Sequence, residues 1–337
     1  MILRRITVGL AALAVGAAFA APVLAQDSSL DVVADGLANP RNMSFDGEGN
    51  LYVAESGLAG SQLSPDDTAY GASGQVTRIA PDGTQEVVVA GLISYRAGDT
   101  LGVSDVVATD ESLWLLLGET RDFRIPFTHA LVELDIETNR VKTFVDLLTL
   151  ELTEDPDANP NQQSNATDME VLADGTVIIA NAGCNCLMSW SPEAGLAVAA
   201  VWPFESDNPV PTAVDSDAEG NIYVGFLTGF PFPEGGSRIE KWNNGQLVET
   251  YSGLTAVTGL LVTADGTLYA SEYGVFAPGQ GWGPGRVVTV SSEGITPVLE
   301  GLNRPFGLAQ NADGEIFVAV GSSGTEAAGM IVRVPGM

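Results

Sequence analysis

The chain has 337 residues and a formal net charge of −29, because 43 acidic residues stand against 14 basic ones, and 45% of its residues are hydrophobic. This charge argues against nucleic-acid binding, since a protein needs clustered Lys and Arg to displace the counterions of a phosphate backbone. The single histidine excludes a site built from several His ligands, and the hydrophobic fraction is too high for a disordered acidic chain.

The first 25 residues have the pattern of a secretory signal peptide. Two arginines form the charged start, Ile6–Ala21 is an apolar run, and Ala25 is the small residue before the cleavage point. A membrane anchor is the alternative interpretation, but the apolar run is short for a bilayer span and no later stretch is long enough. We therefore expect export to the periplasm or the medium, no membrane attachment after cleavage, and a single domain over residues 26–337.

A unit of two strands joined by an acidic turn recurs along the rest of the chain. Asp174-Gly175 and Asp265-Gly266 are its clearest turns, because glycine tolerates the positive φ of a tight hairpin between β-rich runs. A second pair of strands follows each turn, as in Arg286–Val290 with Thr296–Leu299. Six units of four strands predict an all-β fold, a six-bladed β-propeller. The last residues of the six turns are Gly49, Ser112, Gly175, Gly220, Gly266 and Gly314.

The two ends of the repeat region complement each other. The last unit stops at Gly329–Val334 and lacks a fourth strand, whereas a spare strand, Leu30–Ala34, precedes the first unit. We expect this N-terminal strand to complete the last blade, because an open ring would leave unpaired strand edges between the first and last blades. Two smaller β domains are the alternative, but no Pro/Ser/Gly-rich linker separates the units.

The long insertions are predicted to lie on one face of the ring. Loops that join blades and loops between second and third strands share a face in a propeller, and five insertions fall in those loops. Binding sites are usually carried on loops over a rigid scaffold, so this face is the predicted binding surface. Tolerated growth of surface loops is the alternative. The insertions are residues 57–73, 92–102, 149–165, 228–236 and 273–285.

Oxygen-bearing side chains are predicted to face the channel mouth on that side. They stand at the ends of second strands or at the starts of innermost strands, and hard cations such as Ca²⁺ bind clusters of this kind. A solvated polar channel without a bound ion is the favoured interpretation, because no spacing here is diagnostic, and a Ca²⁺ site among Glu55, Asp105, Asp168 and Glu272 is the alternative. The candidate ligand or metal residues are Asn42, Glu55, Asp105, Glu119, Asp168, Asn181 and Glu272.

Three further features have limited diagnostic value. The run Asp155–Asn159 has alternating acids like a calcium loop, but Pro160 stands where an EF-hand has glycine. Cys184 and Cys186 are predicted to form an exposed disulfide, with two free thiols as the alternative, and they are too few for a structural zinc site. The single histidine, His129, directly precedes a predicted strand and is interpreted as structural.

Several segments resemble the ScyD/ScyE family of exported propellers, named for proteins linked to the cyanobacterial pigment scytonemin. The most specific is Leu227–Pro233, since nothing in propeller geometry demands its sequence. The resemblance implies the fold and export, but no established reaction, and it gives the two cysteines no role. The segments that carry it are Asn39-Pro40, Gly49–Glu55, Ser164-Asn165, Val210–Thr212, Tyr223–Pro233 and Gly235–Arg238.

A broader resemblance is to NHL-type and gluconolactonase-type six-bladed propellers. Pro211–Gly220 looks like the lactonase segment that carries a metal-binding aspartate, but Thr212 occupies the place of that aspartate here. Quinone-dependent sugar dehydrogenases share the propeller too, but such a site wants a catalytic histidine and basic residues for an anionic cofactor.

Two functions therefore remain as hypotheses. The first is an exported binding or scaffold protein whose loop face holds a small molecule, a peptide or a partner protein. The second is a divalent-metal-dependent hydrolase of lactones or esters. Loss of the lactonase-like aspartate favours the first. Loop aromatics would supply contact area for a ligand, or would cap the blade ends as packing, which is the favoured interpretation for Phe230 and Phe232. These aromatic residues are Tyr95, Phe230, Phe232, Tyr273, Phe276 and Trp282.

Overall fold

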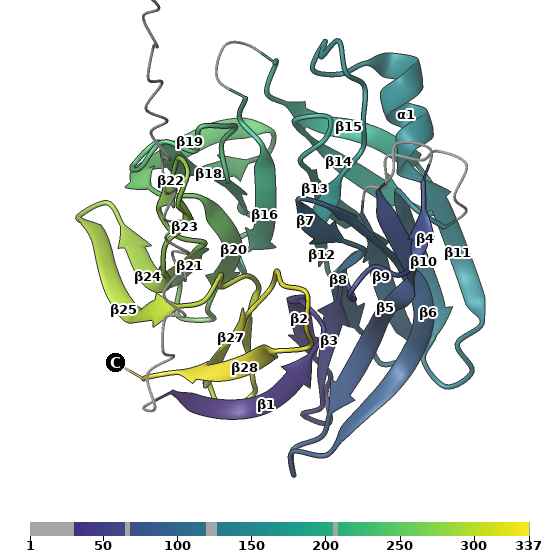
Figure 1. The fold of residues 1–337 in the computed structure, drawn as a ribbon. Coiled ribbons are helices and arrows are strands. Elements are labelled where there is room, and N and C mark those ends of the chain that lie inside the picture. The colour runs from purple at the N-terminus through teal and green to yellow at the C-terminus, as the bar shows by residue number, and fades with distance from the viewer. Residues whose placement is uncertain (1–29, 65–67, 119–126, 205–207, 337) are drawn as a thin grey trace, which may run out of the picture.

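The computed structural model describes residues 30–64, 68–118, 127–204 and 208–336. The predicted signal peptide and the candidate residue Glu119 lie outside the described residues. Six sheets stand around a central axis as the blades of a six-bladed β-propeller (Figure 1), as the repeat predicted.

The first three blades follow the chain in order, with the innermost strand first in each. The first blade is the largest, because β4 pairs with β5 and β7 with β6. The strands are β2 (Pro40–Phe45), β3 (Leu51–Glu55), β4 (Gln62–Leu63), β5 (Ala69–Ile79), β6 (Gln85–Ala97) and β7 (Asp99–Leu101); β8 (Val103–Ala108), β9 (Ser112–Leu117), β10 (Ala130–Asp135) and β11 (Val141–Asp146); and β12 (Ala166–Val171), β13 (Val177–Asn181), β14 (Cys186–Ser191) and β15 (Gly195–Val201).

The last three blades include the one that closes the ring. In the sixth blade the order is β26-β27-β28-β1, so the N-terminal strand pairs antiparallel with the last strand of the chain (Figure 1). This is the predicted closure. The strands are β16 (Pro211–Ser216), β17 (Ile222–Phe226), β18 (Ser237–Asn243) and β19 (Gln246–Leu254); β20 (Val257–Val262), β21 (Leu268–Glu272), β24 (Gly285–Ser291) and β25 (Gly294–Leu302); and β26 (Leu308–Gln310), β27 (Ile316–Val320), β28 (Gly329–Val334) and β1 (Asp31–Leu37).

The hydrophobic core lies between blades rather than within one. Each large cluster of buried side chains draws on two neighbouring blades; for example, Leu116 and Leu131 of the second blade pack with Met169 and Ile179 of the third. Second strands such as β13 are buried along their whole length, whereas the outermost strand β15 alternates between exposed and half-buried residues. Blades with apolar residues on both faces can be buried only by stacking side by side around the axis.

Some predicted loops contain regular structure. The insertion 92–102 forms the end of β6 and the short strand β7, and the insertion 149–165 contains most of the helix α1 (Leu147–Glu154). The insertion 273–285 contains a small hairpin of β22 (Phe276–Ala277) and β23 (Gly281–Trp282). In the described residues no helix is long and apolar enough to cross a membrane.

Candidate functional site

A pocket of about 520 Å³ lies over one end of the axial channel, on the face that carries the long insertions. Its volume is in the range of small-molecule sites. Its lining residues come from innermost strands, here called the floor, from β7 and neighbouring segments of the first and sixth blades, called the polar wall, and from insertions of the fourth and fifth blades, called the aromatic wall. Polar lining residues include Arg41, Ser56, Asp99, Ser104, Thr167, Thr212, Thr258 and Arg304, and apolar ones Leu227, Phe232, Tyr273, Trp282 and Phe306.

Hydroxyl groups on the pocket floor join adjacent blades. Three of them donate to a backbone carbonyl at or just before the start of the next innermost strand: Ser104 to Ala166 at 2.8 Å, Thr212 to Val257 at 2.7 Å, and Thr258 to Pro305 at 2.9 Å. The Thr167 hydroxyl donates within its own blade, to the Ala180 carbonyl at 3.2 Å. A hydroxyl has one proton and two lone pairs. Because the protons are used within the protein, the floor offers a ligand mainly hydrogen-bond acceptors.

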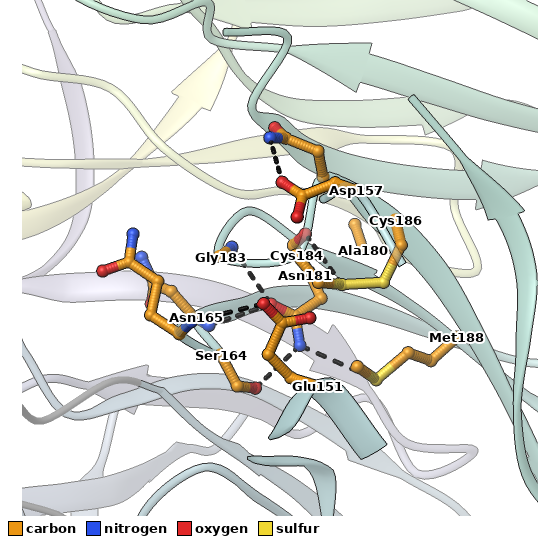
Figure 2. The surroundings of a disulfide bond; sticks show 12 residues. Glu151, Asp157, Ser164, Asn165, Ala180, Asn181, Gly183, Cys184, Cys186 and Met188 are labelled. Carbon is orange, nitrogen blue, oxygen red and sulfur yellow. Dashed lines mark hydrogen bonds between the residues drawn. A yellow bond between two sulfur atoms is a disulfide. The ribbon is translucent and has the colours of Figure 1, made fainter. Parts of the chain in front are cut away.

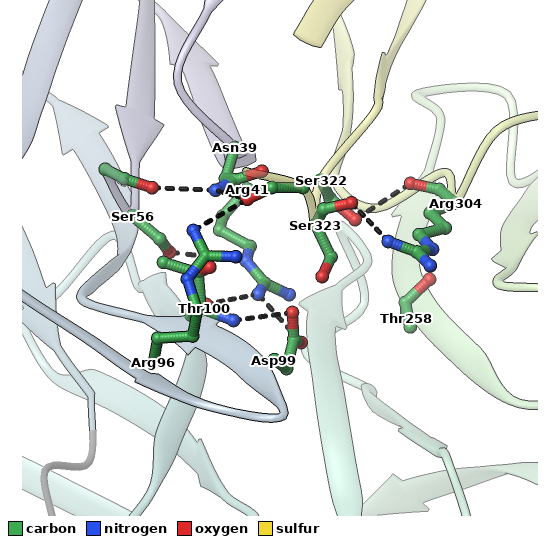
Figure 3. A network of polar contacts seen from close by, with 12 residues as sticks. Asn39, Arg41, Ser56, Arg96, Asp99, Thr100, Thr258, Arg304, Ser322 and Ser323 are labelled. Carbon is green, nitrogen blue, oxygen red and sulfur yellow. Dashed lines mark hydrogen bonds and ion pairs between the residues drawn. The ribbon is translucent and has the colours of Figure 1, made fainter. Parts of the chain in front are cut away.

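Arg41 forms the polar wall and is held in place from several sides (Figure 3). Its Nη2 lies 2.9 Å from Asp99 Oδ2 and donates to the Thr100 carbonyl at 2.6 Å, and its guanidinium lies 4.6 Å from the centre of the Phe306 ring. Burial alone would raise the pKa of Asp99, but the charge of Arg41 and hydrogen bonds outweigh it and lower that pKa. Asp99 therefore stays ionised at neutral pH.

Arg304 supplies a second guanidinium to the pocket. Its Nη1 donates to the Ser323 carbonyl (Figure 3), and within the described part of the chain it makes no ion pair with a carboxylate. An arginine has five N–H donors, so most of its hydrogen-bonding capacity is available. In a chain this acidic, such a group favours an anionic or acceptor group on the ligand.

The aromatic wall adjoins the polar wall, since Phe306, which lies under the Arg41 guanidinium, belongs to the same buried cluster as Tyr273. Trp282 packs against Phe232 with ring centres 4.8 Å apart and against Tyr273 at 4.9 Å. Phe276 and the exposed Phe230 complete the cluster without lining the pocket. Tyr95, predicted as a contact aromatic, is instead fully buried. Phe232, for which packing was the favoured interpretation, lines the pocket together with Tyr273 and Trp282.

A smaller cavity of about 200 Å³ lies further along the channel and contains three predicted site residues, Asn42, Asp105 and Asp168. Asp105 Oδ2 accepts the Met169 N–H at 2.9 Å, Asp168 Oδ2 the Val214 N–H at 2.8 Å. Both contacts run to the innermost strand of the next blade. Asp215, which the sequence analysis did not select, continues the series.

Burial changes the ionisation of these channel acids. It raises the pKa of Asp105 and of Asp215 to about 7, opposed by hydrogen bonds and reinforced by the charge of Glu170. Burial and the charge of Asp105 raise the pKa of Asp168 well above its ordinary value. These three channel carboxyls therefore keep their protons to a higher pH than carboxyls in water do.

The other predicted residues lie elsewhere. Glu55, Asn181 and Glu272 each end a second strand and bind a backbone N–H of the connector into the same blade: Glu55 accepts from Ala38, and Glu272 from Thr255, both at 2.5 Å. Asn181 accepts from the residue before β12 at 2.8 Å (Figure 2). None of the three lines either channel cavity. The predicted ligand residues therefore do not form one ring around the axis. Some line the channel, whereas these three hold connectors in place.

The carboxylates predicted as metal ligands are also not grouped as a metal site would require. The four acids predicted as metal ligands do not include a set of three with ligand atoms within 4.8 Å of one another. Among the described residues, Glu151, Asp155 and Asp157 form such a set. Burial, reinforced by the charge of Asp157, raises the pKa of Glu151 to about 7.

Cys184 and Cys186 are joined by a disulfide, with Cα atoms 5.2 Å apart (Figure 2). Both residues are fully buried, so the expectation of an exposed disulfide is corrected: the loop between them packs beneath the insertion 149–165. His129 is also buried, and its Nδ1 lies 2.6 Å from the Ser164 carbonyl oxygen. This contact fits the structural interpretation of the histidine.

Sequence reasoning missed Arg41, Asp99 and Arg304 as pocket residues. Asp99 lies in the insertion 92–102, which has no counterpart in the other blades, and Arg304 precedes Pro305 as Asn39 precedes Pro40, so the repeat marks the position of Arg304 but not its charge. The hydroxyl residues do follow the repeat. Each is the second residue of an innermost strand, one residue before the strand position of the candidates Asp105 and Asp168, and they are Ser104, Thr167, Thr212 and Thr258.

Solved structures share this fold. The chain is similar to a Thermus thermophilus protein described as an oxidoreductase (glucose dehydrogenase), with 12% identity and a TM-score of 0.58 over 91% of this chain and 99% of that one. A gluconolactonase of Xanthomonas campestris is similar at 11% identity and a TM-score of 0.55 over 90% and 89% of the two chains. A streptogramin B lyase is similar at 10% identity and 0.53, over 91% and 97%.

The shared feature is the propeller. At these identities the likeness shows the fold alone, and the three activities named for these proteins differ from one another. No protein-family profile matches the sequence. No curated protein matches it significantly either.

Proposed function

We propose that this chain is an exported binding protein of the ScyD/ScyE type that holds a small molecule in the pocket above its axial channel. One observation carries the proposal: a 520 Å³ pocket on the elaborated face has a cationic wall, an aromatic wall and a floor of hydrogen-bond acceptors. The ligand class that fits is a compact molecule with a planar apolar body, an anionic group and a hydrogen-bond donor.

Three of the six segments that resemble the ScyD/ScyE family contribute residues to this pocket. Val210, Thr212, Leu227 and Phe232 lie in two of those segments and line it, as does Asn165 of a third. The segments that carry the resemblance therefore include part of the proposed binding site.

Export is supported by two independent features of the chain. One is the signal-peptide pattern over the first 25 residues. The other is the disulfide between Cys184 and Cys186, because such bonds persist mainly in oxidising compartments. A binding protein of the periplasm or the medium fits both features.

The metal-dependent hydrolase of lactones or esters is the second candidate. The fold is shared with a gluconolactonase, and Asp105 and Asp168 in the lower channel have raised pKa values suited to proton transfer. Against it, Thr212 stands in the place of the lactonase-like aspartate, and its hydroxyl already bonds the Val257 carbonyl.

The test is a binding screen on the purified exported protein, using aromatic carboxylates such as indole-3-acetate and 4-hydroxybenzoate with their methyl esters. We expect the acids to raise the melting temperature and to quench tryptophan fluorescence. Trp282→Ala should weaken binding of acid and ester about tenfold, because an aromatic contact contributes ~1–1.5 kcal/mol. Arg304→Gln should weaken only the acids.

Phe230→Ala is the matched control, because Phe230 belongs to the same aromatic cluster but is 75% exposed and does not line the pocket. Binding that Trp282→Ala and Arg304→Gln leave unchanged would contradict the proposal. Divalent-dependent turnover of a lactone that Asp168→Asn abolishes would favour the hydrolase instead.

A further inference from the structure

A second group of acids lies away from the channel, where the insertion 149–165 packs on the third blade. Glu151 is in the last turn of α1, Asp155 follows the helix as its C-cap, and Asp157 is two residues further on. One carboxylate oxygen from each lies within 4.8 Å of the other two. Ca²⁺ bonds oxygens at ~2.3–2.6 Å, so oxygens around one ion lie within about 5 Å of one another.

Two of these carboxylates are buried without a balancing charge. Glu151 and Asp157 are both fully buried, whereas Asp155 is exposed. Over the described ranges, none of the three forms an ion pair with Lys, Arg or His. Burying a carboxylate without a partner is costly, and proteins normally pair such groups or coordinate a metal with them.

Glu151, a member of the group, has a buried carboxylate oxygen without a hydrogen-bond partner. Its Oε1 lies 3.3 Å from the Gln163 N–H, but its buried Oε2 has no hydrogen-bond partner. Buried polar atoms are rarely left without a partner, and each exception calls for a missing donor or ion. The observation is separate from the clustering itself, since an acid can belong to a cluster with both oxygens satisfied.

The remaining contacts hold Asp157 in position rather than neutralise it. Its Oδ2 accepts from Asn185 Nδ2 at 2.7 Å (Figure 2), and its Oδ1 accepts the Asn159 N–H at 3.1 Å. Carboxylate oxygens have further lone pairs, so both can still bind a cation. Carboxylates that ligate a metal ion are usually held in position by hydrogen bonds of this kind.

We propose that Glu151, Asp155 and Asp157 bind one Ca²⁺ ion that fastens the insertion 149–165 to the third blade. The ion supplies the missing partner of Glu151 Oε2 and balances the buried charge, and backbone carbonyls or water complete its shell. Asn185 lies between the two cysteines and connects Asp157 to the Val210 N–H at 2.9 Å, so the ion also supports the connector that borders the ligand pocket.

The test is calorimetric titration of the metal-free, full exported chain with CaCl₂, together with melting curves in Ca²⁺ and in EDTA. We expect one ion per chain and a melting temperature several degrees higher with Ca²⁺. Glu151→Gln and Asp157→Asn should each weaken binding at least tenfold. Asp155→Asn, at an exposed position that folding tolerates, should weaken it by a smaller factor.

Asp174→Asn is the control, since Asp174 is an exposed acid in a turn of the same blade; it should bind Ca²⁺ as the parent does. Trp282→Ala should also keep the ion, which separates this site from the ligand pocket. The proposal is overturned by an absence of binding, or by stoichiometric binding that all three cluster variants retain. It is also overturned if Glu151→Gln raises the melting temperature equally in Ca²⁺ and EDTA, because a proton would then satisfy the carboxyl.

Discussion

At the scale of single residues, the acids of this chain fall into distinct structural roles. Those in surface turns bind nearby backbone N–H groups and have lowered pKa values, as Asp82 does through Thr84. Those in the channel bind the next blade and have raised pKa values, as Asp105 and Asp168 do. Acidic residues therefore stabilise turns at the solvent-exposed surface, and in the channel they hydrogen-bond one blade to the next.

We expect mildly acidic conditions to stabilise the fold, because the channel acids have raised pKa values in the folded state. Where the folded-state pKa is raised, the folded state binds more protons between about pH 4 and 7, so the free energy of unfolding falls as pH rises through that range. We expect the melting temperature to be higher at pH 5 than at pH 8. Asp168→Asn should raise it at pH 8 by about 2–5 °C and reduce its pH dependence.

Asp82→Asn removes the same charge from an exposed turn and is the control for general charge repulsion. Its pH dependence should remain that of the parent. An equal effect of both variants in melting curves from pH 4.5 to 8 would assign the behaviour to net charge instead of the channel.

At the scale of elements, insertions contribute many of the polar and aromatic side chains of the candidate sites, whereas the blades themselves repeat one architecture. β7 carries Asp99 to Arg41, the β22–β23 hairpin carries Trp282 to the pocket, and α1 carries Glu151 to the acid group. Each insertion leaves the four-stranded blade intact, because it extends a loop between strands that are already paired. The site can therefore vary while the fold is kept.

Helix α1 provides a prediction at this scale. Its N-cap, Asp146, accepts from the N–H groups of Leu148 and Thr149 at 3.0 and 3.2 Å. Asp146→Ala should destabilise the helix by about 1 kcal/mol, which corresponds to roughly fivefold faster amide exchange over residues 147–154. Asp146→Ser keeps a capping oxygen and should restore slow exchange; equal exchange rates in the two variants would argue against the cap.

At the scale of the whole molecule, stability depends on closing the ring. β1 pairs with β28, and the buried side chains of the sixth blade pack against those of the first. Gly329 begins β28 opposite Leu37 of β1, and a methyl group there would overlap the ring of Pro40 in the first blade. This glycine is required by the close approach of the last blade to the first.

Gly329→Ala should therefore strain the closure and lower the free energy of unfolding by about 1–3 kcal/mol. The measurement is denaturant unfolding followed by circular dichroism. Gly47→Ala is the control, because the nearest atom to its added methyl is Asp110 Oδ1 at 3.9 Å. If the two variants unfold alike, the contact between Gly329 and Pro40 does not limit closure.

The sequence by itself determined the number of blades, their order and the closing strand. These follow from local signals: apolar strands, Asp-Gly turns such as Asp174-Gly175, and a spare strand that could pair only with an incomplete blade. It also located the elaborated face. Such features repeat along the chain, so one copy supports another and no contact between distant residues has to be known.

Only the tertiary structure decided which polar groups meet. The repeat places both Glu55 and Asp105 near the loop face. In the structure Glu55 holds a connector, whereas Asp105 lines the channel. The direction of a side chain at a strand end depends on how the next segment packs, and the repeat does not contain that information. The partners of Arg41 and of Glu151 come from insertions without a repeat. Their contacts form only after the blades have brought those insertions together, so no periodic pattern contains them.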